Sequence, residues 1–289
     1  MINGKFGFGI IGAGMIAHVH AKAIGAIGNA TLVGLHSRGN EKMQAFAAQH
    51  SCKAFNTLEE MLADPAIDIV CVCTPSGAHE DPTLHCLQAG KHCLVEKPLE
   101  VTLEKCDSII EASRMTGMKV GVIFPSRFYD QALLLKKAMD TDKFGDIVLG
   151  DAYVKWHRSE AYYKSNPWRG TIALDGGGAL MNQASHYIDL LDWLMGPVES
   201  VMTYTATLAR DIEVEDSGVV ALRWRSGTLG TVNVSMLTYP KNLEGSITIL
   251  GDKGTVKIGG IAVNEIQTWK FEVQRDYDVD IQSANYQTT

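Results

Sequence analysis

The chain has 289 residues, 46% of them hydrophobic and 20% charged, which is the composition of a globular protein and not of a disordered or fibrous one. Its formal net charge of −7 argues against a nucleic-acid partner, because a phosphate backbone requires a broad face of Lys and Arg. The sequence contains no apolar run of bilayer length and no signal-peptide pattern at its start, so we expect a cytoplasmic protein with no membrane partner.

The cysteines all lie in the first half of the chain, within apolar stretches. They are Cys52, Cys71, Cys73, Cys86, Cys93 and Cys106. Cys71 and Cys73 would share one face of a strand, but no His or Cys cluster accompanies them, so ordinary buried thiols are favoured over a metal site.

Short β-rich runs alternate with helical patterns in the first part of the chain. The runs predicted to be strands are residues 6–11, 31–36, 67–73, 92–96 and 119–124. Residues 67–73 are apolar at nearly every position, as in a parallel strand covered on both faces. Gly90 and Gly117 stand where helices end before the next strand. This alternation predicts an α/β domain with a doubly wound parallel sheet.

After a predicted helix at residues 131–139, long alternating runs are joined by short turns. The predicted strands are residues 147–157, 198–208, 219–224, 228–237, 246–250 and 255–258. Hairpin turns are expected at Ser226-Gly227 and at residues 251–254. The change predicts a dinucleotide-binding domain over residues 1–125 and, over residues 126–289, an α+β domain with an open, largely antiparallel sheet.

A single helix, from Gly178 to Met195, interrupts these strands. Ile188, Leu191 and Leu194 recur at helical spacing, so we expect them to form its buried stripe.

A glycine-rich loop, Gly12-Ala13-Gly14-Met15-Ile16-Ala17, directly follows the first strand and opens a helix. Such glycines allow a tight turn and a close approach to a pyrophosphate, which helix-starting amides bind. A merely structural turn is the alternative, but the position at the first strand–helix junction favours dinucleotide binding. The predicted cofactor-binding residues here are Gly12, Gly14, Met15 and Ile16.

The second strand ends in His36-Ser37-Arg38, where a carboxylate for a ribose 2′-hydroxyl would usually stand. A hydroxyl followed by a guanidinium suits a 2′-phosphate, so Ser37 and Arg38 are expected to bind the cofactor and favour NADP over NAD. A solvated loop arginine is the alternative interpretation.

Two further motifs directly follow parallel strands, at the sheet edge where ligands of open α/β folds bind. They are Thr74-Pro75-Ser76, with His79, and Glu96-Lys97-Pro98. Lys97 is suited to hydrogen-bond a reacting hydroxyl, although alone it would be interpreted as an exposed lysine. The residues expected to contact the cofactor are Thr74, Pro75, His79 and Glu96.

Together with residues 176–191, Gly-Gly-Gly-Ala-Leu-Met-Asn-Gln-Ala-Ser-His-Tyr-Ile-Asp-Leu-Leu, these motifs resemble the glucose-fructose oxidoreductase/inositol dehydrogenase (Gfo/Idh/MocA) family of NAD(P)-dependent sugar oxidoreductases. The resemblance covers nearly the whole chain and includes Gly90-Lys91-His92. It implies a Rossmann domain, a second domain whose open sheet often serves oligomer contacts, and hydride transfer at a site between them. The implied partners are a sugar, cyclitol or nucleotide-linked sugar and further copies of the chain, as a dimer or tetramer.

The resemblance also implies catalytic roles. Lys97 matches the family's catalytic lysine and His186 its catalytic histidine. Asn182 is a departure, because many members carry Asp there, four residues before the histidine and so on the same helix face. An amide orients a hydroxyl but does not accept its proton, so His186 is the first candidate for the general base and Lys97 the second, or a relay.

A predicted loop over residues 156–171 is rich in aromatic, arginine and amide side chains, a mixture that suits sugar hydroxyls and an anionic group. It is similar to the branch of the family acting on nucleotide-linked amino sugars, including dehydrogenases that oxidise the 3-hydroxyl of a UDP-N-acetylhexosaminuronate. A loop that simply caps the second sheet is the alternative. The residues expected to bind substrate are Arg158, Tyr163, Trp168 and Arg169.

Two other functions share this fold. A glycosidase could use bound NAD as a redox relay, and a non-catalytic redox sensor would need neither Lys97 nor His186, whose presence speaks against it. Family members usually end with a further strand and helix, whereas this chain stops at Thr289 after a polar stretch, so we expect a truncated second domain.

Overall fold

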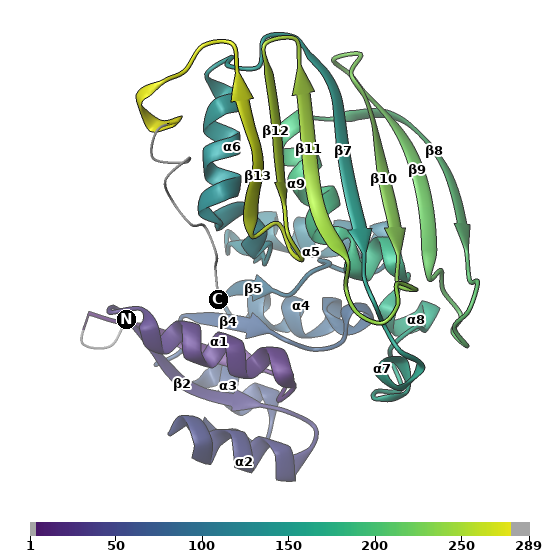
Figure 1. Cartoon of the computed structure of the whole chain (residues 1–289). Coiled ribbons are helices and arrows are strands. Elements are labelled where there is room, and N and C mark those ends of the chain that lie inside the picture. The colour runs from purple at the N-terminus through teal and green to yellow at the C-terminus, as the bar shows by residue number, and fades with distance from the viewer. Residues whose placement is uncertain (1–3, 279–289) are drawn as a thin grey trace. The chain divides into compact units, whose positions relative to one another are not determined.

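The computed structural model describes residues 4–278, which form two compact units (Figure 1). The first unit comprises the described residues up to Ile123 together with Ala173–Gly176. The second comprises Phe124–Ile172 and the described residues from Gly177 onward. Residues 279–289, the end of the predicted second domain, lie outside the described residues.

The first unit contains a parallel sheet with the strand order β3-β2-β1-β4-β5-β6. Its strands are β1 (Phe6–Ile11), β2 (Ala30–His36), β3 (Lys53–Ala54), β4 (Ile69–Val72), β5 (His92–Val95) and β6 (Val120–Val122). The predicted doubly wound sheet is therefore confirmed, and its order reverses between β1 and β4, where open α/β sheets bind ligands. The sequence did not indicate β3, because two residues are too few to show a periodicity.

Helices connect these strands and cover both faces of the sheet. They are α1 (Met15–Ala26), α2 (Asn40–His50), α3 (Leu58–Ala63), α4 (Glu80–Gln88) and α5 (Leu103–Thr116). Neighbouring residues of β1 enter different cores: Ile10 packs in the cluster with Phe46 of α2, and Ile11 in the cluster with Leu87 of α4. Gly90 and Gly117 both have φ of +72°, which confirms them as the glycines that follow helix ends.

All six cysteines are free thiols. Cys71, Cys73, Cys86 and Cys93 are buried, as predicted, and burial raises the pKa of Cys71 to about 12. Cys52 and Cys106 are only half-buried, so the prediction of buried thiols was wrong for these two.

The second unit contains a sheet with the order β13-β12-β11-β7-β10-β9-β8. Its strands are β7 (Ile147–Lys155), β8 (Val198–Ala206), β9 (Ser217–Trp224), β10 (Leu229–Ser235), β11 (Glu244–Gly251), β12 (Gly254–Gly259) and β13 (Glu265–Phe271). Only β7 and β10 pair in parallel, so the predicted open, largely antiparallel sheet is confirmed. The edge strand β13 was not predicted, because its residues are half-buried or exposed and lack a buried alternate row.

Helices α6 (Asp130–Asp140) and α9 (Ser185–Met195) cover one face of this sheet (Figure 1). The core between them includes Leu135 of α6, Leu190 of α9 and Val154 of β7, each fully buried. None of the described helices combines the length and the apolar character that a membrane span requires.

The predicted helix from Gly178 to Met195 is divided in two. A π-helical turn, η3 (Ala179–Gln183), comes first, and α9 begins after Ala184. The buried stripe of α9 consists of Tyr187, Leu190, Leu191 and Leu194. Ile188 is 39% exposed, so its place in the predicted stripe was wrong, because restarting the helix sets the i, i+3, i+4, i+7 row at Tyr187.

Two short helices were not predicted. They are α7 (Glu160–Lys164), inside the predicted loop over residues 156–171, and α8 (Ile172–Asp175), directly after it. The hydroxyl of Ser159 accepts a hydrogen bond from the Tyr162 amide and so caps α7, a local signal that the aromatic composition of this segment obscured.

Candidate active site

The glycine loop between β1 and α1 has the geometry that a dinucleotide requires. Gly12 has φ of +105°, and a Cβ there would lie 2.8 Å from the Cys73 carbonyl oxygen. Gly14 is the N-cap of α1 and has open space where a Cβ would stand. The first turn of α1 contains no acidic side chain and no side-chain cap, so nothing charged competes with an anion for its amides. The loop thus fits a pyrophosphate.

The end of β2 presents Ser37 and Arg38 beyond a fixed backbone. His36 anchors this end, with Nδ1 3.0 Å from the Phe55 carbonyl oxygen. Ser37 is half-buried and Arg38 is exposed, and within residues 4–278 the Arg38 guanidinium makes no hydrogen bond or ion pair. It is therefore available to a ligand phosphate.

The loops that follow β4 and β5 are joined by His79, which is 1% exposed. Its Nδ1 lies 2.8 Å from the Pro98 carbonyl oxygen and its Nε2 lies 3.0 Å from the Thr74 carbonyl oxygen. Both ring nitrogens thus face backbone carbonyls, so His79 holds Thr74-Pro75 against the Glu96-Lys97-Pro98 loop. Its expected contact with the cofactor stays a prediction.

A buried carboxylate strengthens this junction. Glu100, 3% exposed, accepts hydrogen bonds from the amides of His79 (3.3 Å) and Val101 (2.6 Å) and from Lys105 Nζ (3.3 Å). The sequence did not indicate Glu100 or Lys105, because their partners lie in other loops and no local spacing marks them.

Glu96 is tied to the helix that carries the glycine loop. Its Oε1 lies 2.8 Å from Nε2 of His20 on α1, and its Oε2 accepts a 3.3 Å hydrogen bond from the Lys97 amide. Lys97 follows as a half-buried residue at the sheet edge, as the sequence predicted. His20, also missed by the sequence analysis, connects the predicted cofactor loop with the predicted catalytic lysine.

In the second unit, Asn182 lies in η3 and His186 is the second residue of α9. The backbone amide of Asn182 donates to the Gly178 carbonyl oxygen at 2.9 Å. The ring of Phe124 meets that of His186 edge-on, with centroids 5.9 Å apart. The expectation that both residues share one face of a continuous α-helix was wrong, because the helix type changes between them.

An ion pair fixes α9 one turn beyond His186. Arg127 Nε and Nη2 donate to the two carboxylate oxygens of Asp189 at 2.7 and 2.6 Å. This bidentate bond raises the pKa of Arg127. Such fork-like pairs restrict orientation as well as distance, so the His186 backbone is rigidly supported.

The predicted substrate segment is organised around Tyr162. The guanidinium carbons of Arg158 and Arg169 lie 5.2 and 4.3 Å from the centroid of its ring, and that of Arg169 lies 4.8 Å from the Trp168 ring. Arg169 Nη1 and Gln183 Nε2 both donate to the Tyr162 hydroxyl. Two cations from separate parts of the segment are thus held on one aromatic ring.

Tyr163, predicted from the sequence to bind substrate, is 7% exposed and packs edge-on against Tyr162. The neighbouring Tyr162 occupies the position between the arginines instead. The burial of Tyr163 follows from the phase of α7, which was not predicted, and its substrate contact stays a prediction.

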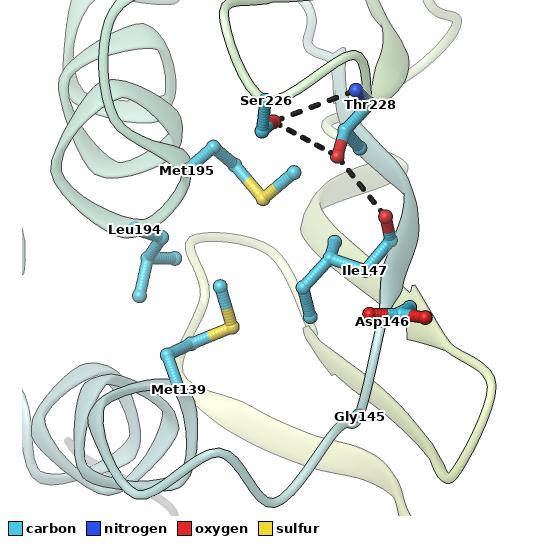
Figure 2. A pocket seen from close by; sticks show the side chains of 8 residues that line it. All are labelled: Met139, Gly145, Asp146, Ile147, Leu194, Met195, Ser226 and Thr228. Carbon is cyan, nitrogen blue, oxygen red and sulfur yellow. Dashed lines mark hydrogen bonds between the residues drawn. The ribbon is translucent and has the colours of Figure 1, made fainter.

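The cavity in Figure 2, of about 350 Å³, is not this site. It lies at the C-terminal end of α9 and is lined by Met139, Gly145, Asp146, Ile147, Leu194, Met195, Ser226 and Thr228. Its hydroxyls bond to protein, since Thr228 Oγ1 accepts from Ser226 Oγ and donates to the Ile147 carbonyl oxygen. None of the predicted site residues contributes to it.

Comparison with known proteins gives two family matches that together span most of the chain. Residues 6–124 match an oxidoreductase family with an NAD-binding Rossmann fold, and residues 132–257 match the GFO/IDH/MocA C-terminal domain. An inositol 2-dehydrogenase of Rhizobium meliloti is 27% identical over 257 residues, which cover 86% of this chain and 74% of the relative.

Two solved structures are considerably more similar. The WlbA dehydrogenase of Bordetella pertussis, solved with NADH and UDP-GlcNAcA, is 46% identical, with a TM-score of 0.95 over 99% of this chain and 83% of its own. The WlbA dehydrogenase from Chromobacterium violaceum, solved with the same two compounds, is 45% identical, with a TM-score of 0.94 over 98% of this chain and 82% of its own. These relatives support a dehydrogenase and neither the glycosidase nor the redox sensor. The chain belongs to the Gfo/Idh/MocA family of oxidoreductases, with an NAD-binding Rossmann domain.

Proposed function

We propose that this protein is a dehydrogenase that oxidises a secondary hydroxyl of a nucleotide-linked sugar acid, of the class of UDP-GlcNAcA. The observation that carries the proposal is its 45–46% identity, over nearly the whole chain, to two dehydrogenases solved with NADH and that compound. The cationic cluster of Arg158 and Arg169 around Tyr162 supports it, because a sugar carboxylate or a diphosphate requires such a partner.

In the proposed reaction His186 accepts the proton of the reacting hydroxyl as general base. Asn182 orients this hydroxyl through its amide, and Lys97 hydrogen-bonds to the same oxygen and stabilises the developing negative charge. Bound nicotinamide supplies the hydride acceptor. The rigid supports of these residues, Arg127–Asp189 for α9 and His79 with Glu96 for the Lys97 loop, keep the reacting groups in place.

For the cofactor we propose NAD(H), with Gly12, Gly14, Met15 and Ile16 around the pyrophosphate. The support is that both similar WlbA structures were solved in complex with NADH. NADP(H) is the second candidate, because no carboxylate follows β2 and the exposed Arg38 suits a 2′-phosphate. Thr74, Pro75, His79 and Glu96 remain proposed cofactor contacts, and Tyr163 and Trp168 remain proposed sugar contacts.

We also propose that the protein forms a homo-oligomer through the open face of its second sheet. Met202 and Tyr204 of β8 and Val219 of β9 share this face and are 79%, 88% and 53% exposed. Apolar side chains gathered on a sheet face favour association with another copy, which light scattering after size exclusion would measure.

The decisive experiment presents UDP-GlcNAcA, UDP-GlcNAc and the free sugars with NAD or NADP while nicotinamide absorbance is recorded. We expect turnover with UDP-GlcNAcA and NAD, and slower turnover with UDP-GlcNAc, whose sugar lacks the carboxylate. Absence of turnover with every sugar would contradict the proposal. Free sugar released without net cofactor reduction would indicate a glycosidase instead.

A further inference from the structure

A glutamate outside every sequence motif holds the start of the segment that carries Asn182 and His186. Glu215 lies in the connection between β8 and β9. Its Oε2 accepts a 2.9 Å hydrogen bond from the Gly178 amide, and its Oε1 accepts a 2.8 Å bond from the Leu180 amide. Its carbonyl oxygen accepts a third, from the Ala179 amide at 2.8 Å. Three successive amides are therefore bound by one residue.

The approach is close enough to require glycine. A Cβ on Gly178 would lie 1.8 Å from the Glu215 carbonyl oxygen, and the residue adopts φ −105° and ψ −116°, outside the regions that other residues favour. The glycine of this motif is thus explained by contact with Glu215.

Hydrogen bonds transmit this anchoring to the predicted catalytic residues. The Gly178 carbonyl oxygen accepts from the backbone amide of Asn182 at 2.9 Å, and the Ala179 carbonyl oxygen accepts from the backbone amide of Ala184 at 2.8 Å. The Ala184 carbonyl oxygen in turn accepts from the Ile188 amide of α9 at 3.0 Å. Glu215 is therefore connected to both ends of the short stretch that contains Asn182 and His186.

The neighbouring carboxylates bind other segments. Glu213 Oε2 accepts from the Ile172 amide at 2.8 Å. The carboxylate of Asp216 accepts from the amides of Leu208, Ala209 and Arg210. Of these three acidic side chains, Glu215 is the one bound to the segment of Asn182, so its role is not a general property of the connection.

We propose that Glu215 is a positioning residue for the dehydrogenase reaction: by fixing the π-helical turn η3 it sets the places of Asn182 and His186 relative to the reacting hydroxyl. The inference rests on the proposed function. A carboxylate is required because it accepts from two amides at once, whereas the Gln amide group offers one acceptor atom. A π-turn is an uncommon structure that is frequent at functional sites, and an external anchor explains how it is held.

The test compares Glu215→Ala, which loses both side-chain bonds, with Glu215→Gln, which retains one acceptor. Asp252→Asn is the matched control, because Asp252 Oδ1 likewise accepts a backbone amide of the second unit, that of Asp146, at 2.8 Å. The control bond is also distant from the predicted catalytic residues. Asp146 borders the cavity at the C-terminal end of α9, whereas His186 lies at the start of this helix, about 14 Å away along its axis.

We expect Glu215→Ala to lower kcat about 100-fold, since a displacement of about 1 Å of a catalytic group has this effect. The kcat of Glu215→Gln should be lowered less, on the order of 10-fold, because one acceptor remains. The affinity for NADH should stay unchanged in both variants. Asp252→Asn should retain wild-type kcat even if it lowers Tm equally. Equal kcat for Glu215→Ala and the control, in a wild-type enzyme that turns over, would overturn the inference.

Hydrogen exchange provides a readout that does not depend on turnover. Glu215→Ala should accelerate exchange in a peptide covering residues 177–186, and Asp252→Asn should not. Unchanged exchange there would overturn the positioning role by itself. An inactive wild type with accelerated exchange in Glu215→Ala would instead contradict the proposed function, and with it the catalytic part of the inference.

Discussion

Nε2 of His20 lies 2.8 Å from Oε1 of Glu96, and the two side chains are only 10% and 13% exposed. This pair connects α1, which begins at the glycine loop, with the residue that precedes Lys97. A ligand that orders one of these elements therefore acts on the other through a direct hydrogen bond.

Replacement of His20 by Ala should reduce catalysis without unfolding the protein. The nearly buried Glu96 carboxylate would lose a partner, at a cost of about 1–3 kcal/mol, and the Lys97 loop would lose its tie to α1. We expect kcat to fall on the order of 10-fold, which corresponds to a rise of about 1.4 kcal/mol in the activation free energy. His85→Ala is the control, since His85 is an exposed histidine beside Asp81 on α4. Equal kinetics of the two variants would contradict a role of His20 in placing Lys97.

His186→Ala should lower kcat by about two to four orders of magnitude, the range expected for loss of a general base. NADH affinity, measured by fluorescence titration, should remain within about 2-fold, because the glycine loop belongs to the first unit. Ile188→Ala is the matched control on the same helix, since Ile188 is exposed. A kcat of His186→Ala close to that of the control would refute the assigned role.

The sequence predicted those parts of the fold and site that depend on local patterns. Gly12 and Gly14 are recognisable because a tight turn between a strand and a helix restricts residue type at fixed spacing. The carboxylates that hold the loops in place could not be predicted in this way. Glu215 and Glu100 bind backbone amides distant in the chain, so no fixed spacing in the sequence marks them. The burial of Tyr163 could not be predicted for a third reason: it follows from helix α7, which the sequence did not indicate.

Arg38→Ala distinguishes the two candidate cofactors. If NAD(H) is the cofactor, wild-type protein should bind NADH more tightly than NADPH, and the variant should keep its NADH affinity within about 2-fold. NADPH binding should weaken by about 10-fold or more, since a hydrogen bond to a charged group contributes about 1.5–3 kcal/mol. Titration of both reduced cofactors measures this. Tighter binding of NADPH than of NADH by the wild type would contradict NAD(H), and loss of that preference in the variant would show that Arg38 selects NADP(H).

The last prediction concerns stability, through the buried pair of Lys143 and Asp278. Their side chains are 2% and 3% exposed, and Lys143 Nζ donates to both oxygens of Asp278. The carboxylate also accepts from Trp269 Nε1 at 2.7 Å and from the Arg275 amide at 2.6 Å. Burial raises the pKa of Asp278, but these hydrogen bonds outweigh it and hold the pKa below its usual value.

A carboxyl whose pKa is lower in the folded state stabilises the fold above its unfolded pKa, about 3.9, and loses this contribution as pH falls through the folded value. The free energy of unfolding should therefore decline on acidification below about pH 4 more steeply in wild type than in Asp278→Asn. At neutral pH Asp278→Asn should cost about 3–5 kcal/mol, because Lys143 stays buried without its counter-charge. Lys143→Met combined with Asp278→Leu should recover most of this loss. Urea unfolding across a pH series measures these differences. If the free energy of unfolding declined equally with acidification in wild type and in Asp278→Asn, the pair would not determine the acid stability of the second unit.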